Sequence, residues 1–96
     1  MRLRDRLIEM REVITRTAAA SGAHDVRVFG SVARGEDHDQ SDIDFLVTLE
    51  SGRTLLDLAR LEEQLEALLG RPVDVVTENG LRERIRASAL HEAVRV

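Results

Sequence analysis

The chain has 96 residues, of which 43% are hydrophobic and 33% are charged, which predicts one soluble globular domain over residues 1–96. The formal net charge of −4 does not favour nonspecific binding to nucleic acid, and the lack of Trp and Tyr argues against stacking on single-stranded bases. The chain has no cysteine, no lysine and no apolar run long enough to span a membrane. These absences exclude disulfides, thiolate metal sites and Schiff-base chemistry, and the expected location is the cytoplasm.

The first half of the chain alternates between helical and extended patterns. Apolar residues at three- and four-residue spacing predict an amphipathic helix over residues 2–20. A short strand follows at 26–29 and leads into Gly30, and the polar residues 35–41 predict a loop. Strict alternation predicts a strand over 42–49, with Ile43 and its apolar partners on one face and Asp42, Asp44, Leu46 and Thr48 on the other.

The second half continues the alternation. Thr54 is a plausible N-cap for a leucine-rich helix that ends at Gly70, and a strand is expected at 73–77. Asn79 and Gly80 then turn the chain into a last helix, with residues 81, 85 and 89 on one face. The expected fold class is α/β (α+β), with a small mixed sheet of three or four strands flanked by helices.

Three aspartates are poorly suited to a packing role. Asp42 and Asp44 are two residues apart on a predicted strand and therefore share a face, and Asp74 lies within the strand at 73–77. Aspartate is a poor strand former, and like charges on one face repel each other, so the arrangement costs stability. If the two strands are neighbours, a spacing of about 4.8 Å brings the carboxylates together around a cation such as Mg²⁺. The alternative is a pair of edge strands whose polar faces are solvated.

A phosphate-binding turn is predicted where the first strand ends. Gly30 lets a phosphate approach the backbone, and Ser31 offers a hydroxyl donor and an N-cap for a short helix. The amides at the start of that helix favour an anion, and Arg34, one helical turn further on, can donate to phosphate oxygens. The spacing matches neither a dinucleotide-binding loop nor a Walker loop. The plainer alternative is a strand–turn–helix with a capping serine.

Together the two motifs resemble the DNA polymerase β-like nucleotidyltransferase superfamily. The shared pattern is a Gly-Ser pair, ten residues, an Asp-x-Asp pair flanked by apolar residues, and a later aspartate in a strand. The stretch GSVARGEDHDQSDIDFLV is similar to the minimal nucleotidyltransferases, the MNT antitoxins that are encoded with HEPN-domain toxins. The resemblance covers nearly the whole chain and implies the nucleotidyltransferase fold.

The resemblance also implies a role for each matched residue. Asp42 and Asp44 would bind two Mg²⁺ ions, and Asp74 would bind the catalytic ion and help to activate the attacking hydroxyl. Two ions about 3.5–4 Å apart suit an in-line displacement at the α-phosphate of ATP.

Phosphate binding is implied for the glycine-serine turn. Gly30 and Ser31 would hold the triphosphate, and Arg34 occupies a position that carries a phosphate-binding arginine in some relatives. Because the chain has no Tyr or Trp to stack a base, a partner or a second subunit would have to complete any nucleobase selectivity.

Two functions of different classes are open at this point. The first is an enzyme that transfers AMP from Mg-ATP to a hydroxyl, which the resemblance implies to be a tyrosine of a HEPN toxin. The second is an antitoxin that blocks its partner by contact alone and retains a vestigial nucleotide site. The three costly carboxylates favour the enzyme, and an antibiotic nucleotidyltransferase would need an acceptor domain. The oligomeric state, homo- or hetero-oligomer, stays open.

Overall fold

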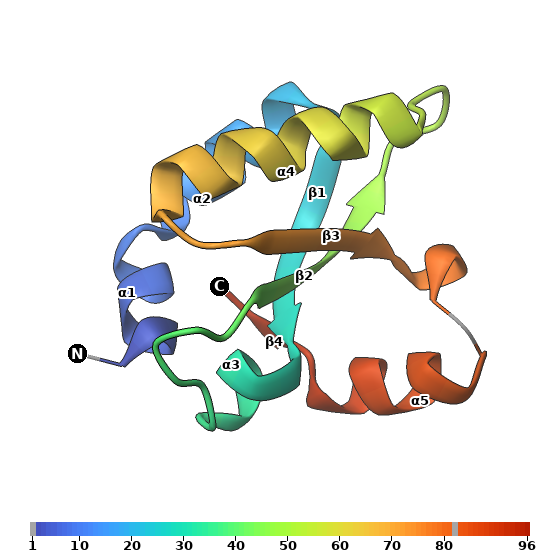
Figure 1. Ribbon diagram of the computed structural model, residues 1–96. Coiled ribbons are helices and arrows are strands. Elements are labelled where there is room, and N and C mark those ends of the chain that lie inside the picture. The colour runs from blue at the N-terminus through green and yellow to red at the C-terminus, as the bar shows by residue number, and fades with distance from the viewer. Residues whose placement is uncertain (1, 82) are drawn as a thin grey trace.

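The computed structural model describes residues 2–81 and 83–96 (Figure 1). In chain order its helices and strands are α1 (Leu3–Glu9), α2 (Arg11–Ala20), β1 (Ala23–Phe29), α3 (Gly30–Arg34), β2 (Ile43–Leu49), α4 (Leu55–Leu69), β3 (Val73–Thr77), a 3-10 helix η1 (Glu78–Gly80), α5 (Glu83–Glu92) and β4 (Val94–Arg95).

The strands form one mixed four-stranded sheet in the order β3-β2-β1-β4. β1 is antiparallel to both β2 and β4, whereas β2 and β3 are parallel. The prediction of a small mixed sheet flanked by helices is therefore confirmed. β4 was not predicted, because a two-residue strand carries no periodicity that a sequence pattern can reveal.

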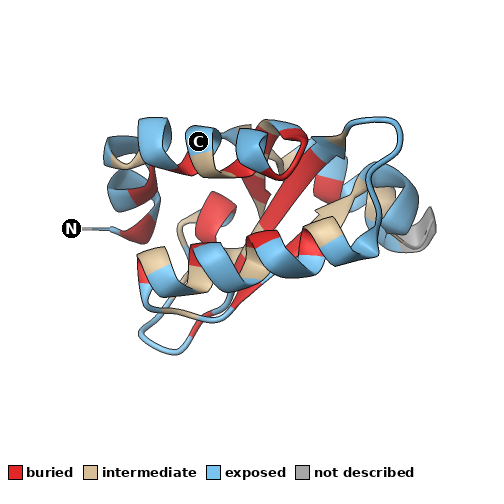
Figure 2. Cartoon of the chain, turned by 90° about the horizontal axis from the view of Figure 1, so that it is seen from above, coloured by how far each residue is buried: buried red, intermediate tan, exposed pale blue. Residues whose placement is uncertain are grey.

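The main core lies between the sheet and the helices α1, α2 and α4. Ile43, Phe45 and Val47 of β2 are each at most 1% exposed and belong to one buried cluster with leucines of α4. Figure 2 shows that the buried residues line the inward sides of the helices and the strands between them. Leu46, on the opposite face of β2, is also fully buried, although the alternation placed it with the polar residues. α5 lies on that side of the sheet in Figure 1 and contributes the buried Ala89.

The helix predicted over residues 2–20 is two helices that meet at Met10, so this prediction was wrong in its continuity. Met10 has φ −93° and ψ 8°, and its N–H still donates to the Arg6 carbonyl at 3.0 Å. The bend allows α1 to pack on α3, with Leu3 and Leu7 buried, while α2 packs on β1 and α4. Tertiary packing causes the bend, since no Gly or Pro marks it in the sequence.

The first strand begins three residues earlier than predicted because it contains a bulge. Asp25 has a positive φ of 52°, and the pairing with β2 shifts register between His24 and Arg27. The extra residue breaks the alternation, so that Ala23 and Val26 are both buried. β2 begins at Ile43, one residue later than predicted, so Asp42 lies immediately before the strand.

α4 is capped as the sequence predicts and leads directly into β3. The Thr54 hydroxyl accepts a hydrogen bond from Leu56 N–H at 3.2 Å, and the Asp57 carboxylate accepts one from Thr54 N–H at 2.9 Å. At the other end Gly70 adopts the left-handed conformation, with φ 69°, that ends many helices. β3 therefore starts close to the end of α4.

The last helix differs from its prediction. η1 precedes it, and α5 begins only at Glu83; Ala89 is buried as predicted, whereas Ile85 is 46% exposed. Over residues 2–81 and 83–96, no helix combines the length and the apolar character that crossing a membrane requires.

Candidate active site

Asp44 and Asp74 lie side by side on neighbouring strands. β2 and β3 pair in parallel with Asp44 directly opposite Asp74, while Ile43 and Phe45 pair with Val73 and Val75 on the core face. Strands side by side are about 4.8 Å apart, so the two carboxylates emerge next to each other on the face away from the main core. The condition on which the aspartate prediction depended, that the two strands are neighbours, is met.

Asp42 completes the group from the turn before β2. It is exposed and lies two residues before Asp44, outside the hydrogen-bonded ladder. The charges of both Asp74 and Asp42 act on the Asp44 carboxyl. Asp44 and Asp74 thus lie side by side at the end of the sheet where β2 and β3 begin, and Asp42 is near enough for its charge to act on Asp44.

The electrostatics of Asp44 reflect this crowding. Burial of its carboxyl raises the pKa of Asp44 above the ordinary value, and the charges of Asp74 and Asp42 raise it further. Arg34 opposes these effects, because its positive charge lowers the pKa. A carboxyl group whose ionised form is disfavoured in this way is characteristic of sites that are completed by a cation or a substrate.

Gly30 brings the backbone of the glycine-serine turn against Asp44. Phe29, the residue before it, pairs with Asp44 across β1 and β2. A Cβ atom on Gly30, which has φ +72°, would stand only 2.6 Å from Asp44 Oδ2. The absence of a side chain at Gly30 is therefore what allows this turn to approach the carboxylate.

Ser31 follows Gly30 in the first turn of α3 and is partly buried. It does not cap the helix as predicted: α3 begins at Gly30, and the extended residue Phe29 occupies the cap position without a side-chain hydrogen bond. The positive φ of Gly30 turns the chain straight out of β1 into α3, which leaves no separate capping residue. The backbone carbonyl of Ser31 accepts a hydrogen bond from Glu36 N–H at 2.8 Å and closes this turn.

Arg34 ends α3 near the carboxylates, but its guanidinium is engaged with glutamates. Its Nη1 donates to both carboxylate oxygens of Glu92, at 3.0 and 3.1 Å, and its Nε donates to Glu36 at 3.2 Å. These bonds raise the pKa of Arg34. Glu92 has no signal in the sequence, because it lies 58 residues from Arg34 and no local pattern connects the two residues.

The donor set fits a hard divalent cation. Carboxylate oxygens with water and substrate phosphates are the ligands that Mg²⁺ prefers. In the part of the chain that the structure describes, no three His, Asp or Glu side chains are arranged closely enough to hold a metal ion by themselves. Carboxylates repel each other in the absence of a cation, so substrate phosphate oxygens would have to complete the coordination.

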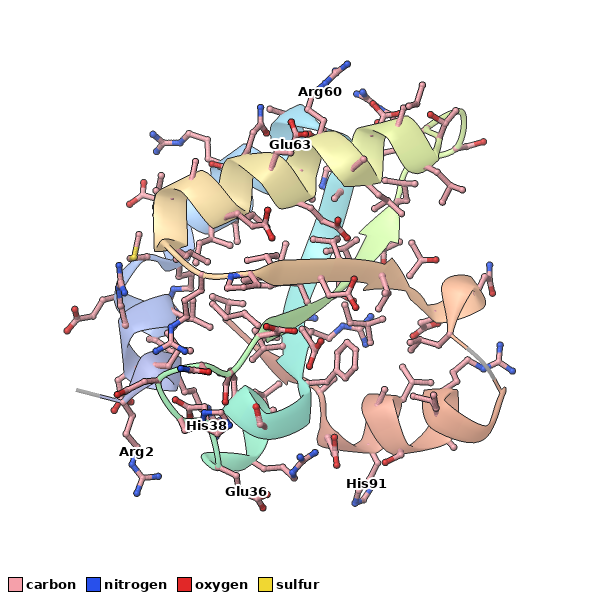
Figure 3. All side chains as sticks on the ribbon, viewed as in Figure 1. Arg2, Glu36, His38, Arg60, Glu63 and His91 are labelled. Atoms are coloured by element: carbon pink, nitrogen blue, oxygen red, sulfur yellow. The ribbon has the colours of Figure 1, made fainter. Side chains whose placement is uncertain are left out.

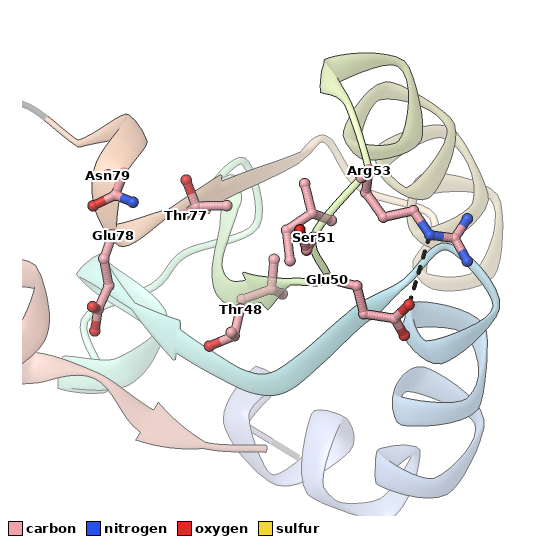
Figure 4. A pocket seen from close by; sticks show the side chains of 10 residues that line it. Thr48, Glu50, Ser51, Arg53, Thr77, Glu78 and Asn79 are labelled. Carbon is pink, nitrogen blue, oxygen red and sulfur yellow. Dashed lines mark ion pairs between the residues drawn. The ribbon is translucent and has the colours of Figure 1, made fainter.

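A cleft lies at the other end of the sheet. A pocket of about 360 Å³ is lined by the ends of β2 and β3 and the loops that follow them, and Figure 4 shows it. Its polar side chains include Thr48, Glu50, Arg53 and Thr77, and none of the six predicted site residues lines it. The histidines are scattered over the described residues: His24 pairs with Glu50, and Figure 3 shows His38 and His91 well apart.

Comparison with known proteins places this geometry in a family. The family model described as a nucleotidyltransferase domain matches residues 10–96. The protein adenylyltransferase MntA of Thermococcus cleftensis is 45% identical over 75 residues, which cover 78% of this chain and 76% of that protein. The chain therefore belongs to the nucleotidyltransferase family.

Solved structures agree with this assignment. A structure assigned to the minimal nucleotidyltransferases has a TM-score of 0.85 and 52% identity, with 97% of this chain and 95% of that chain covered. A toxin–antitoxin structure with AMP-PNP has a TM-score of 0.69 and 20% identity, covers 97% of this chain and 71% of its own, and shows the shared fold alone. The resemblance to minimal nucleotidyltransferases is confirmed, as is the prediction that the chain is a nucleotidyltransferase.

Proposed function

We propose that this protein transfers AMP from ATP to a hydroxyl group in a Mg²⁺-dependent reaction. The observation that carries the proposal is the register of β2 and β3, which sets Asp44 against Asp74 with Asp42 two residues away. Gly30 approaches the Asp44 carboxylate closely and belongs to the turn for which the resemblance implies phosphate binding. Membership of the nucleotidyltransferase family supports the reaction class.

The carboxylates would hold two Mg²⁺ ions and move the proton. Asp42 and Asp44 would ligate the ions, and Asp74 would ligate the catalytic one and accept the proton of the attacking hydroxyl. The ions would neutralise phosphate charge and stabilise the developing charge at the α-phosphorus. A bond forms from the hydroxyl oxygen to the α-phosphorus, the bond to the bridging oxygen of the β-phosphate breaks, and pyrophosphate leaves.

The glycine-serine turn would bind the triphosphate. Gly30 would present its backbone and Ser31 its hydroxyl to the phosphates, and Arg34 would donate to them after leaving Glu92. The chain has no Tyr or Trp with which to grip the base, so the partner or a second subunit would complete base recognition.

The acceptor that we propose is a tyrosine of a HEPN toxin, which AMP transfer would neutralise. The relative from Thermococcus cleftensis is named a protein adenylyltransferase, which supports a protein acceptor. Two structures with the same fold come from toxin–antitoxin pairs, one of them with AMP-PNP, which supports a toxin partner and ATP as the substrate. Because the reaction consumes ATP, we propose the cytoplasm as its location.

A second candidate is an antitoxin that acts by contact alone. The ion pairs of Arg34 with Glu36 and Glu92 favour it, because they occupy the side chain that a working site would offer to phosphate. The Asp44 carboxyl argues against it, because burial and neighbouring charges disfavour its ionised form and a vestigial site would have no physical reason to retain it.

Label transfer distinguishes the two candidates. Incubated with its purified partner and Mg²⁺, the protein should transfer label from α-labelled ATP and not from γ-labelled ATP. Asp44→Asn should reduce the transfer by several orders of magnitude, since charge stabilisation at the reacting phosphate is lost. Label from the γ position alone would exclude nucleotidyl transfer, and full neutralisation of the toxin by Asp44→Asn would favour the contact mechanism.

A further inference from the structure

A closed turn, His38–Ser41, delivers the chain to Asp42. Ser41 N–H donates to the His38 carbonyl at 2.9 Å, and His38 N–H donates to Ser41 Oγ at 2.8 Å. Ser41 is 8% exposed and is one of the few buried polar residues. Asp42 is exposed and precedes β2, so the turn sets the direction in which it leaves.

Arg71 ties this turn to the start of β3. Its Nη1 donates to the carbonyls of His38 and Ser41, at 3.0 and 3.1 Å, across 33 and 30 residues of sequence. The next residue, Pro72, accepts a hydrogen bond from Ile43 N–H at 3.0 Å. Arg71 therefore adds a side-chain link between the turn and the start of β3, beside the backbone bond between Ile43 and Pro72.

We propose that Arg71 is a positioning residue that holds Asp42 near Asp44 and Asp74 for metal binding. The inference rests on the proposed function. The charge of Asp42 acts on Asp44, and Asp42 lies before β2 without a strand pairing of its own, so it would move away from Asp44 if the turn opened. Arg71 is three residues before Asp74 and donates to the carbonyl of Ser41, the residue directly before Asp42, so it links the chain segments that carry the two carboxylates. It touches neither metal nor substrate in this role.

Two neighbouring residues provide controls, one for the positive charge of Arg71 and one for its place at the start of β3. Arg71 lines a cavity of about 430 Å³ together with Arg6, so Arg6→Ala removes a charge there without touching the turn. In Figure 3, Arg2 and His38 mark the position of this cavity between α1 and the turn. Glu66 also holds the start of β3, since its Oε2 accepts a hydrogen bond from Val73 N–H at 2.9 Å. Glu66→Ala therefore loosens the same strand end from the other side.

The test measures the Mg²⁺ concentration that gives half of the maximal binding of a fluorescent ATP analogue. Arg71→Ala should raise this concentration about tenfold, the usual effect of losing a residue that orients a metal ligand. Arg71→Lys keeps the charge and part of the reach, and should fall between Arg71→Ala and the wild type. Arg6→Ala and Glu66→Ala should each stay within about twofold of the wild type. Hydrogen exchange of the Ser41 amide should accelerate in Arg71→Ala and not in the two controls.

Each outcome has a separate meaning. Equal Mg²⁺ dependence of Arg71→Ala and the wild type, or an equal loss in Glu66→Ala, would overturn the role of Arg71 while leaving the proposed function intact. An equal rise of the required Mg²⁺ concentration in Arg6→Ala would overturn the positioning role, because the loss of a positive charge would then explain the effect. If the wild type binds the analogue without any response to Mg²⁺, the proposed function fails first, and the role of Arg71 fails with it.

Discussion

At the scale of single residues, Asp44 shows most directly where the proposed function would oppose stability. Its carboxyl is partly buried on a strand, with Asp74 opposite and Asp42 two residues away, and all three features disfavour its ionised form. Packing alone would not favour a carboxylate at this position. The energy cost therefore provides a way to recognise the site without any substrate.

Asp44→Asn should make the metal-free protein more stable near neutral pH. Removing one of three repelling charges should raise the free energy of unfolding by up to roughly 1–2 kcal/mol, toward the lower end because the side chain is partly solvated. Urea denaturation measures this change, with Asp39→Asn on the exposed loop as a control of equal charge. A loss of stability in Asp44→Asn, or an equal gain in Asp39→Asn, would contradict the account.

The gain from Asp44→Asn should depend on pH. The pKa of Asp44 is raised in the folded protein, so between the ordinary value and the raised one the native state binds more protons than the unfolded state. Stability due to this group is thus fully present at low pH and is lost as the pH rises through the folded pKa. The advantage of Asp44→Asn should vanish below the ordinary pKa and be complete above the raised one, and denaturation across that range measures it. An advantage that is independent of pH would rule out ionisation as its cause.

Gly30→Ala should damage the site more than the fold. An alanine with φ near +72° is strained by about 1 kcal/mol, and its Cβ would also displace the Asp44 carboxylate. Gly70→Ala is a matched control, since Gly70 has φ +69° and open space around its Cβ position. Both variants should lose similar unfolding free energy in urea, but only Gly30→Ala should lose most of its AMP transfer. Equal activities in the two variants would show that the approach of Gly30 to Asp44 is unimportant.

The residue types of this site could be predicted from the sequence, but several contacts could not. Asp42, Asp44 and Asp74 stood out because aspartate is unfavourable in a strand. The pairing of Arg34 with Glu92 depends on how α5 returns to α3, and that is a property of the tertiary fold. The cap assigned to Ser31 was wrong because a glycine with positive φ starts the helix directly.

At the scale of helices and strands, the last residue of α5 supplies a partner for Arg34. The two carboxylate oxygens of Glu92 hold the guanidinium that the proposed function needs for phosphate. Because Arg34 is 42% exposed and Glu92 24% exposed in their side chains, solvent screens the pair and it contributes little to stability.

Glu92→Gln should therefore strengthen nucleotide binding without unfolding the protein. With Arg34 released, the affinity for Mg-ATP should rise several-fold, while the melting temperature changes little. Titration with a fluorescent ATP analogue measures the affinity. Glu36→Gln, which removes the other partner of Arg34, should show a smaller effect in the same direction. Unchanged affinity in both variants would show that Arg34 does not bind the phosphates.

The elements themselves were predicted where one period persisted over many residues. α4 and the strands β2 and β3 follow from leucine spacing, alternation and the Thr54 cap. The break at Met10 and the bulge at Asp25 lack a sequence signal, because each depends on how its segment packs against the rest of the fold. The buried Leu46 shows the same effect, since it lies on the face that the alternation predicted to be polar.

At the scale of the whole molecule, the sheet separates two regions of different character. The carboxylates and Gly30 lie where β2 and β3 begin, whereas the pocket of about 360 Å³ lies where the same strands end. The proposed site is an open, charged surface, as expected if a partner protein brings the acceptor hydroxyl to it.

The central claim is that Asp42, Asp44 and Asp74 form one site for a metal ion and a nucleotide. The most direct test compares the melting temperatures of the wild type and Asp44→Asn, each with and without millimolar Mg-ATP. A ligand that binds only the folded state raises the melting temperature by mass action, so the wild type should shift upward and Asp44→Asn much less. Identical shifts in both proteins, or no shift in either, would mean that the three aspartates are independent surface residues.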